Sequence, residues 1–323
     1  MSDVIKILSI DGGGIRGLIP AVVLAEIEKR TGKPVSELFD LIAGTSTGGI
    51  LALGLTKPGP DGRAEYPAER LIQLYKDKGP RIFSSSIWHK IRSAGGLADE
   101  RYPAKGIEEV LEEYFGDARL KDSVTEVLVT GYEIERGSPW FFRRRSARTK
   151  PGYDFDMKQV ARATSAAPTY FEPIRIEAEG RAEYYAVVDG GVYANNPAMC
   201  AYVDALASFP EAGDFLVLSL GTGTRQSPIL YHDAKDWGLA GWAKPILGVV
   251  FDGVSDTVEY QLGQLLPEKN GVQRYYRFQT KVSKENSALD NADQDNLRAL
   301  VLIAEQLVEE HTADIDRLCA QLG

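Results

Sequence analysis

The chain has 323 residues, with 37 Lys and Arg against 46 Asp and Glu, which gives a formal net charge of −9 near neutral pH. A hydrophobic fraction of 44% and a charged fraction of 26% indicate a globular protein with a sizeable core, and they exclude a disordered or collagen-like chain. Two distant cysteines, Cys200 and Cys319, cannot form a disulfide framework or a thiolate zinc site, and three scattered histidines leave little room for a metal centre. We therefore expect a reducing compartment, no metal and no cofactor.

The N-terminal segment lacks the apolar core of a signal peptide. The uncharged stretch at 41–56 is too short and too polar to span a bilayer. These features predict a cytoplasmic protein. The net negative charge disfavours binding to nucleic acid polymers and constitutive binding to anionic membranes, so any membrane contact should be local and transient.

Strand-like and helical segments alternate from the start of the chain. A β-rich run at 5–10 is followed by a glycine cluster at 11–17 and a helical segment. The unit then repeats, with a buried strand at 38–43, a tight turn at 44–49 and a second helix at 50–55. Two consecutive strand–helix units predict an α/β protein with a mainly parallel sheet.

The same kind of pattern continues through the rest of the chain. Further strands are predicted at 126–132, 184–188 and 215–220, and helices at 105–115 and 295–322. The stretches at 57–67 and 226–245 lack a clear period and are predicted to be surface loops or lids. Because no composition break divides the chain, we predict one domain over residues 1–323.

The sequence Gly-Thr-Ser-Thr-Gly at 44–48 lies between a predicted buried strand and a predicted helix. At such an elbow the serine has a strained backbone, so the positions two residues before and after it must be small. Gly44 and Gly48 meet that requirement, which makes Ser46 the predicted nucleophile. The alternative is a Ser/Thr/Gly helix cap without chemistry.

The glycine cluster at 11–17 contains G-x-G-x-x-G, the fingerprint of dinucleotide binding. That interpretation needs an acidic residue at the end of the second strand, whereas Asp40 lies inside it. The main hypothesis is that the N–H groups of Gly12, Gly13 and Gly14 converge on a developing oxyanion. A dinucleotide-binding or nucleotide-sensing module without hydrolase activity stays open as the alternative, as does a purely structural turn.

A nucleophilic serine needs a base. None of the histidines follows a predicted strand: His89, His232 and His311. Asp189, in contrast, directly follows the strand at 184–188, at the sheet edge where open α/β sites form. Partial desolvation would give this carboxylate the proton affinity that a base requires. Asp189 is therefore the predicted base, and a plain Asp-Gly turn is the alternative.

Three ordered motifs together resemble the patatin-like phospholipases: Asp-Gly-Gly-Gly-Ile-Arg-Gly at 11–17, Gly-Thr-Ser-Thr-Gly at 44–48 and Asp-Gly-Gly at 189–191. The resemblance covers about residues 5–225, and a helical extension continues to 323. It implies a three-layer α/β/α fold in which Ser46 and Asp189 form a dyad and the glycine loop is the oxyanion hole. The remaining motif positions support the site: Arg16, Gly17, Gly44, Gly48, Gly190 and Gly191.

The resemblance implies a lipid acyl hydrolase of the phospholipase A type, which cleaves glycerophospholipid esters at a membrane surface. The family includes bacterial effectors of cyclic-oligonucleotide antiphage defence (CBASS), whose compact chains are similar to this one. That branch implies a cyclic di- or oligonucleotide activator and allows an oligomer. The arginines at 143–145 are candidate contacts for the activator, although the aromatic residues just before them favour a sheet edge with solvated arginines.

Apolar side chains beside cations mark three segments that could enter a lipid interface: Ile82–Phe83, Ile87–Trp88 next to Lys90 and Arg92, and residues 237–251. We expect one of them to be a lid over Ser46. The alternative is that these side chains are ordinary core, which is the commoner place for Trp and Phe.

Overall fold

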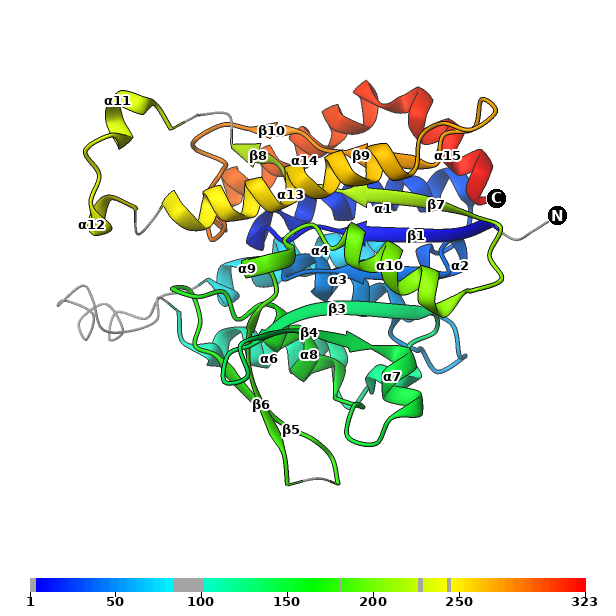
Figure 1. The fold of residues 1–323 in the computed structure, drawn as a ribbon, viewed down its shortest axis with the longest axis horizontal. Coiled ribbons are helices and arrows are strands. Elements are labelled where there is room, and N and C mark those ends of the chain that lie inside the picture. The colour runs from blue at the N-terminus through cyan, green and yellow to red at the C-terminus, as the bar shows by residue number, and fades with distance from the viewer. Residues whose placement is uncertain (1–3, 84–101, 181, 226–228, 243–244) are drawn as a thin grey trace.

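Within the described residues, eight strands form the central sheet of this computed structural model (Figure 1). The structure describes residues 4–83, 102–180, 182–225, 229–242 and 245–323. Five strands run parallel, in the order β3 (Glu126–Glu133), β2 (Leu41–Gly44), β1 (Val4–Ile10), β7 (Asp214–Leu220) and β9 (Tyr275–Phe278). Three further strands join by antiparallel pairing: β4 (Ser138–Arg143) and β6 (Tyr184–Asp189) each pair with β3, and β5 (Ile174–Glu177) pairs with β6.

Helices cover both faces of the sheet, so the predicted three-layer α/β fold with a mainly parallel sheet is confirmed (Figure 1). One face packs against α1 (Leu18–Thr31), α3 (Thr47–Thr56), α4 (Ala68–Ile82), α6 (Ala104–Phe115), α8 (Met157–Thr164), α14 (Gln294–Glu310) and α15 (Thr312–Leu322). The other face packs against α10 (Ala198–Ser208) and α13 (Pro245–Leu265). Short elements complete the fold: η1 (Gly14–Gly17), α2 (Val35–Leu38), η3 (Leu120–Asp122), α7 (Arg144–Thr149), α9 (Gly191–Ala194), α11 (Tyr231–Ala234), α12 (Leu239–Trp242), β8 (Thr224–Arg225) and β10 (Lys281–Val282).

The central strand β1 shows why the sheet is buried on both sides. Its side chains alternate, so that Leu8 and Ile10 enter one hydrophobic cluster while Ile5 and Ile7 enter the other. A strand with apolar residues at both alternations can only lie between two layers of helices. Because β1, β2 and β7 run parallel, their carboxyl ends lie at the same edge of the sheet, where the loops that follow them come together.

The predicted elements are present with small changes at their ends. The strand predicted from residue 38 begins at Leu41, because Val35–Leu38 forms the short helix α2. The helical tail is interrupted at His311 between α14 and α15, and both helices belong to the same buried cluster as α1. The stretch predicted as a loop at 226–245 contains α11 and α12.

The segment of aromatic and basic residues at 140–145 is structural. It forms β4, which pairs with β3, and the beginning of α7. Arg143 forms an ion pair with Asp204, and Arg144 with Glu126, each at 2.8 Å. The predicted strand at the side of the sheet is present. The sequence leaves the role of the arginines open, and the structure pairs two of them, Arg143 and Arg144, with carboxylates.

No helix in the described parts of the chain is both long and apolar enough to cross a bilayer.

Candidate active site

Ser46 lies at the sharp turn from β2 into α3. Its backbone has φ 55° and ψ −124°, a conformation that non-glycine residues rarely adopt. The turn is held on both sides. The Ser46 N–H donates to Thr164 Oγ1 at 2.8 Å, and the hydroxyl of the preceding Thr45 donates to the Ala194 carbonyl at 2.6 Å. The strain is therefore fixed by neighbouring elements, and the serine side chain is presented at the N-terminus of α3.

The two glycines of the elbow are required by close backbone approach. A Cβ atom on Gly44 would lie 2.1 Å from the carbonyl oxygen of Gly48. A Cβ atom on Gly48 would lie 2.1 Å from the carbonyl oxygen of Ile10, at the end of β1. Backbone atoms cannot move aside as a flexible side chain can, so the turn closes only when both positions lack a side chain.

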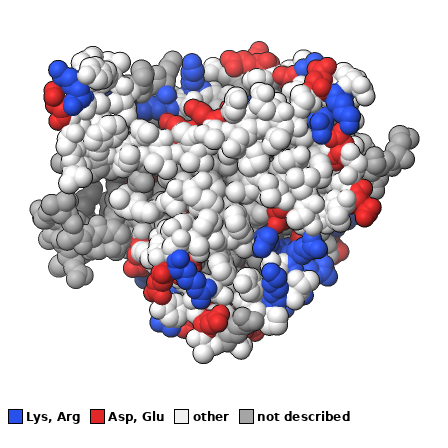
Figure 2. Space-filling model, viewed as in Figure 1, with Lys and Arg blue, Asp and Glu red and all other residues white. Residues whose placement is uncertain are grey.

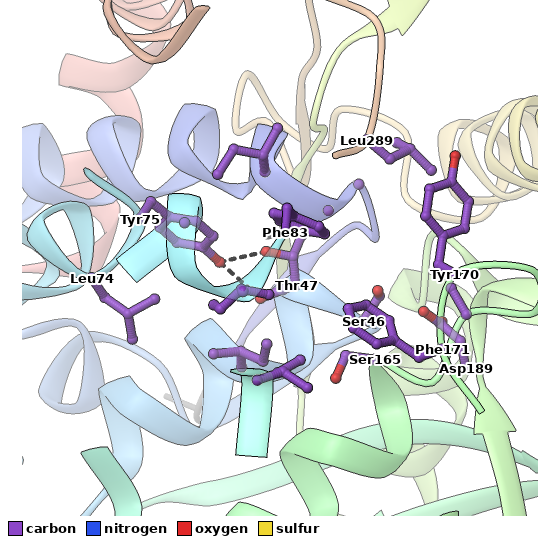
Figure 3. A pocket seen from close by; sticks show the side chains of 18 of the residues that line it. Ser46, Thr47, Leu74, Tyr75, Phe83, Ser165, Tyr170, Phe171, Asp189 and Leu289 are labelled. Carbon is purple, nitrogen blue, oxygen red and sulfur yellow. Dashed lines mark hydrogen bonds between the residues drawn. The ribbon is translucent and has the colours of Figure 1, made fainter. Parts of the chain in front are cut away.

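Asp189 is the last residue of β6 and lies next to Ser46 (Figure 3). Its side chain is only 2% exposed, and its Oδ1 accepts the Gly191 N–H at 2.7 Å. Burial raises the pKa of Asp189 to about 7, against the opposing effects of the Ser46 hydroxyl and the Gly191 N–H, which favour the ionised form. The carboxyl group thus titrates near neutral pH, where a general base works best.

The raised pKa of Asp189 also affects folding. Because the folded protein holds this proton more tightly than the unfolded chain does, the contribution of Asp189 to stability is fully present below its ordinary pKa of 3.8. That contribution is lost as the pH rises through about 7. Ionisation of Asp189 therefore lowers the free energy of unfolding of the protein.

Gly12 occupies a different position in the site from the one the sequence predicts. Its N–H donates to the carbonyl of Asn195 at 2.9 Å, and its own carbonyl accepts the hydroxyl of Thr222 at 2.7 Å. An N–H that already has a good partner is not available to an oxyanion. The prediction that Gly12 is an oxyanion donor is therefore corrected.

Gly13 and Gly14 stay candidates for the predicted oxyanion donors. Both line the same pocket as Ser46, and neither N–H has a hydrogen-bond partner within the part of the chain that the structure describes. Gly14 has φ +57°, and a Cβ atom there would lie 2.1 Å from the carbonyl oxygen of Leu289. Gly14 can thus take this conformation only because it lacks a side chain.

Arg16 holds the glycine loop in place. Its guanidinium donates to the carbonyls of Gly223 at 2.9 Å and Gly13 at 3.4 Å. Burial lowers the pKa of Arg16 to about 10, so it stays charged at neutral pH. Gly17, at the end of the motif, packs so closely that a Cβ atom would lie 2.2 Å from Thr47 Oγ1. These contacts fit the supporting role predicted for both residues.

Arg277 on β9 is an important residue that sequence reasoning missed. Its guanidinium donates to both carboxylate oxygens of Asp11, at 3.0 and 2.6 Å, and to the Ser219 hydroxyl at 2.9 Å. Asp11 begins the glycine loop, so this buried bidentate pair ties the loop to a strand from the last third of the chain. A buried aspartate after a strand requires a cation, but no spacing in the sequence identifies which arginine supplies it.

The pocket around Ser46 is narrow and lined mainly by apolar side chains (Figure 3). It encloses about 70 Å³, room for only a few water molecules. Its apolar lining includes Ile50, Leu74, Ile82, Phe83, Phe171 and Phe251. Phe83 and Phe251 belong to two of the segments predicted to contact lipid, whereas Trp237 and Trp242 do not line the pocket. The lining is suited to a hydrocarbon chain.

The remaining predicted residues lie elsewhere. His232 and His311 do not line the pocket, and His89 and the segment Ile87–Trp88 lie outside the described residues. Gly190 packs against Thr130, and Gly191 against Asp189. Across the described ranges, no group of three or more His, Cys, Asp or Glu side chains is arranged to hold a metal ion.

Comparison with known proteins places the chain in a family. The family model described as "Patatin-like phospholipase" matches residues 8–202. The chain belongs to the patatin-like phospholipase family. Membership makes it a lipid acyl hydrolase by class. Patatin-like protein 2 of rice and patatin-like protein 2 of Arabidopsis thaliana are each 32% identical to it, over 97% of this chain and 85% of theirs.

Other relatives add less to the assignment. A potato protein named "Probable inactive patatin-3-Kuras 1" is 29% identical, over 97% of this chain and 89% of its own. Among solved structures, VipD from Legionella pneumophila aligns with a TM-score of 0.38 at 15% identity, covering 95% of this chain and 67% of that one. The effector ExoU aligns at 0.40 and 11%, covering 97% of this chain and 53% of its own.

We expect Gly48→Ala to destabilise the protein and to abolish its catalytic competence, because the new methyl group would collide with the Ile10 carbonyl. The expected loss is at least ~2 kcal/mol in the free energy of unfolding, measured by urea denaturation. Gly263→Ala on α13 is the matched control, since nothing lies within 4 Å of its added Cβ. That change should raise stability by about 0.5–1 kcal/mol. Equal stability of the Gly48→Ala variant and the unmodified protein would contradict the close approach at the elbow.

Proposed function

We propose that the chain cleaves acyl esters of glycerophospholipids, with Ser46 as nucleophile and Asp189 as its base. The supporting observation is that one apolar pocket brings together the Ser46 hydroxyl, a buried carboxylate of raised pKa and the open N–H groups of Gly13 and Gly14. These are the parts that acyl transfer requires: a nucleophile, a proton acceptor and an oxyanion site.

The reaction takes place in two halves. Ser46 Oγ attacks the ester carbonyl carbon while its proton passes to Asp189, and the N–H groups of Gly13 and Gly14 stabilise the resulting oxyanion. The tetrahedral intermediate expels the lysophospholipid alkoxide, which takes the proton from Asp189. A water molecule then attacks the acyl-enzyme, again delivering a proton to Asp189, and the fatty acid leaves as Ser46 recovers its proton.

The alternative of a dinucleotide-binding module fits the site less well. The space next to the glycine loop is narrow and apolar, and the Ser46 and Asp189 side chains lie in it. A pyrophosphate would need polar room and free N–H groups at the helix terminus. Gly12, the first glycine of the fingerprint, already donates its N–H to Asn195.

The dyad is tested by fatty-acid release from phosphatidylcholine vesicles. We expect Ser46→Ala and Asp189→Asn each to lower kcat by at least ~10³-fold, because each removes a group that takes part in the bond-making step. Ser123→Ala is the matched control, since it removes a buried hydroxyl that donates to the Leu120 carbonyl on η3 and does not line the pocket. Its kcat should be unchanged.

The dyad hypothesis would fail if the Ser46→Ala variant kept more than about a tenth of the activity. Binding of a nicotinamide cofactor that is unaffected by Ser46→Ala would favour the dinucleotide alternative instead.

The rate of hydrolysis should depend on the ionisation of Asp189. Since the pKa of this carboxyl is about 7 and only its ionised form accepts the serine proton, kcat/KM should rise with pH and level off above that value. On the acid side the rate should fall about tenfold for each pH unit. The measurement uses a neutral soluble ester, whose own charge does not change, and a parallel check of folding at each pH. A constant rate from about pH 5 to 9 would contradict this role for Asp189.

We also propose a transient contact with a phospholipid surface through the arm formed by residues 229–242 and 245–249. Exposed large apolar side chains gather there: Ile229, Leu230, Tyr231, Leu239, Trp242, Ile246 and Val249. Figure 1 shows α11 and α12 projecting from the body of the molecule ahead of α13. Val249 is two residues from Phe251, which lines the pocket, so the arm continues into the site. Exposed apolar clusters of this kind mark interaction surfaces.

The arm is tested with the double variant Tyr231→Ser, Leu239→Ser, which changes side chains that are 83% and 95% exposed. Losing two side chains from a lipid interface should weaken vesicle binding by at least ~10-fold. Hydrolysis of a soluble short-chain ester should be unchanged. Leu302→Ser on α14, where the leucine is 58% exposed, is the control and should bind vesicles normally. Unchanged vesicle binding by the double variant would exclude the arm as the docking surface.

We also propose that a cyclic di- or oligonucleotide activates the hydrolysis of phospholipid vesicles. The structure gives it little support at residues 143–145, because Arg143 and Arg144 have carboxylate partners and Arg145 donates to the Ala207 carbonyl. A nucleotide binding there would have to replace those contacts. Vesicle hydrolysis with and without a panel of cyclic dinucleotides tests it directly, and equal rates would exclude activation by the compounds used.

A further inference from the structure

Thr222 is a buried residue with no role in the reaction as described so far. It follows β7 in the short turn at 221–223, and its hydroxyl donates to the Gly12 carbonyl at 2.7 Å. The Gly12 N–H donates to Asn195 on the other side. Both polar groups of Gly12 are therefore held by residues that come from later parts of the chain.

The hydrogen bond from the Thr222 hydroxyl to the Gly12 carbonyl also fixes the direction of the Gly13 N–H. The Gly12 carbonyl and the Gly13 N–H belong to the same planar trans peptide, in which they point in opposite directions. Holding the carbonyl toward Thr222 consequently directs the Gly13 N–H away from Thr222. Without that bond, the peptide plane could rotate about the flexible backbone of two glycines.

Contacts around Gly12 and Gly13 indicate that Ser46 lies on the side of this peptide away from Thr222. A Cβ atom on Gly12 would lie 3.3 Å from Ser46 Cβ, whereas a Cβ atom on Gly13 would lie 2.2 Å from Thr222 Oγ1. The peptide between the two glycines is thus placed between the threonine and the serine. Gly13 also lines the pocket of Ser46, and its N–H has no partner among the described residues.

The turn that carries Thr222 is itself anchored. The Gly221 N–H donates to the Phe278 carbonyl at 2.9 Å, and the Gly223 N–H donates to Gln279 Oε1 at 2.7 Å. Arg16 donates to the Gly223 carbonyl. A hydroxyl on a turn held in three places is a precise positioning group, since its own movement is restricted.

We propose that Thr222 is a positioning residue that aims the Gly13 N–H at the oxyanion by holding the Gly12 carbonyl. The inference rests on the proposed function, because it assumes that an oxyanion forms beside Ser46. It predicts that the Thr222 hydroxyl contributes to the transition state and little to binding of the substrate.

The test compares Thr222→Val, which keeps the size of the side chain and removes the donor, with Thr222→Ser, which keeps the donor. Two quantities are measured: the kinetics on a soluble short-chain ester, and inhibition by a trifluoromethyl ketone that forms an oxyanion adduct with the serine. For Thr222→Val we expect kcat and the affinity for the ketone to fall together by about 10- to 100-fold, with KM within about twofold. Thr222→Ser should stay within about threefold of the unmodified protein.

Controls separate positioning from simple loss of structure. Thr56→Val removes another buried threonine hydroxyl, which donates to the Ala52 carbonyl inside α3, and it should lower the unfolding temperature without changing kcat. Thr222→Val replaces the hydroxyl by a methyl group. Thr222→Ala is therefore measured alongside it, because that variant removes the hydroxyl and adds no atom in its place. Normal kcat and ketone affinity in a folded Thr222→Val or Thr222→Ala variant would overturn the inference. An equal loss in Thr222→Ser would overturn it too, and an unmodified protein that cleaves no ester would overturn the proposed function itself.

Discussion

The candidate active site depends on the close approach of three backbone segments where β2 turns into α3. Gly44, Gly48 and the Ile10 carbonyl lie so near one another that no side chain fits between them. That approach gives Ser46 its positive φ and lifts its hydroxyl above the sheet edge. The same approach brings the end of β1, and therefore the glycine loop, next to the serine. Ser46 and the glycine loop are in this way positioned by a single packing constraint.

In the proposed reaction, burial gives Asp189 the role of base that a histidine has in other serine hydrolases. Asp189 has few polar contacts beyond the Gly191 N–H and Ser46, so its pKa is set mainly by desolvation. A carboxylate in water would be too weak a base to take a serine proton. In the proposed reaction the apolar lining of the pocket thus has two effects, since it would accommodate an acyl chain and it raises the proton affinity of Asp189. Substrate that excludes the remaining water should increase the second effect.

Motifs local in sequence were the most predictable part of the site. The strands, the elbow, Ser46 and Asp189 follow from residue patterns shorter than ten positions, because those patterns specify the backbone directly. The role of Gly12 was not predictable, since it depends on the carbonyl of Asn195, which approaches only in the folded chain. Arg277 is a similar case. A long-range ion pair leaves no periodic signal, and each arginine is an equal candidate until the fold is known.

The pair of Asp11 and Arg277 has a consequence for how the protein becomes active. Removing one partner of a buried ion pair costs about 3–5 kcal/mol, so the start of the glycine loop is unfavourable until Arg277 is in place. Ribosomes make the chain from its N-terminus, and domains generally fold as whole units. Ser46 and Asp189 are therefore synthesised well before the arginine that completes the loop. A nascent chain still shorter than 277 residues therefore contains Ser46 and Asp189 but lacks the cation that fixes the start of the glycine loop.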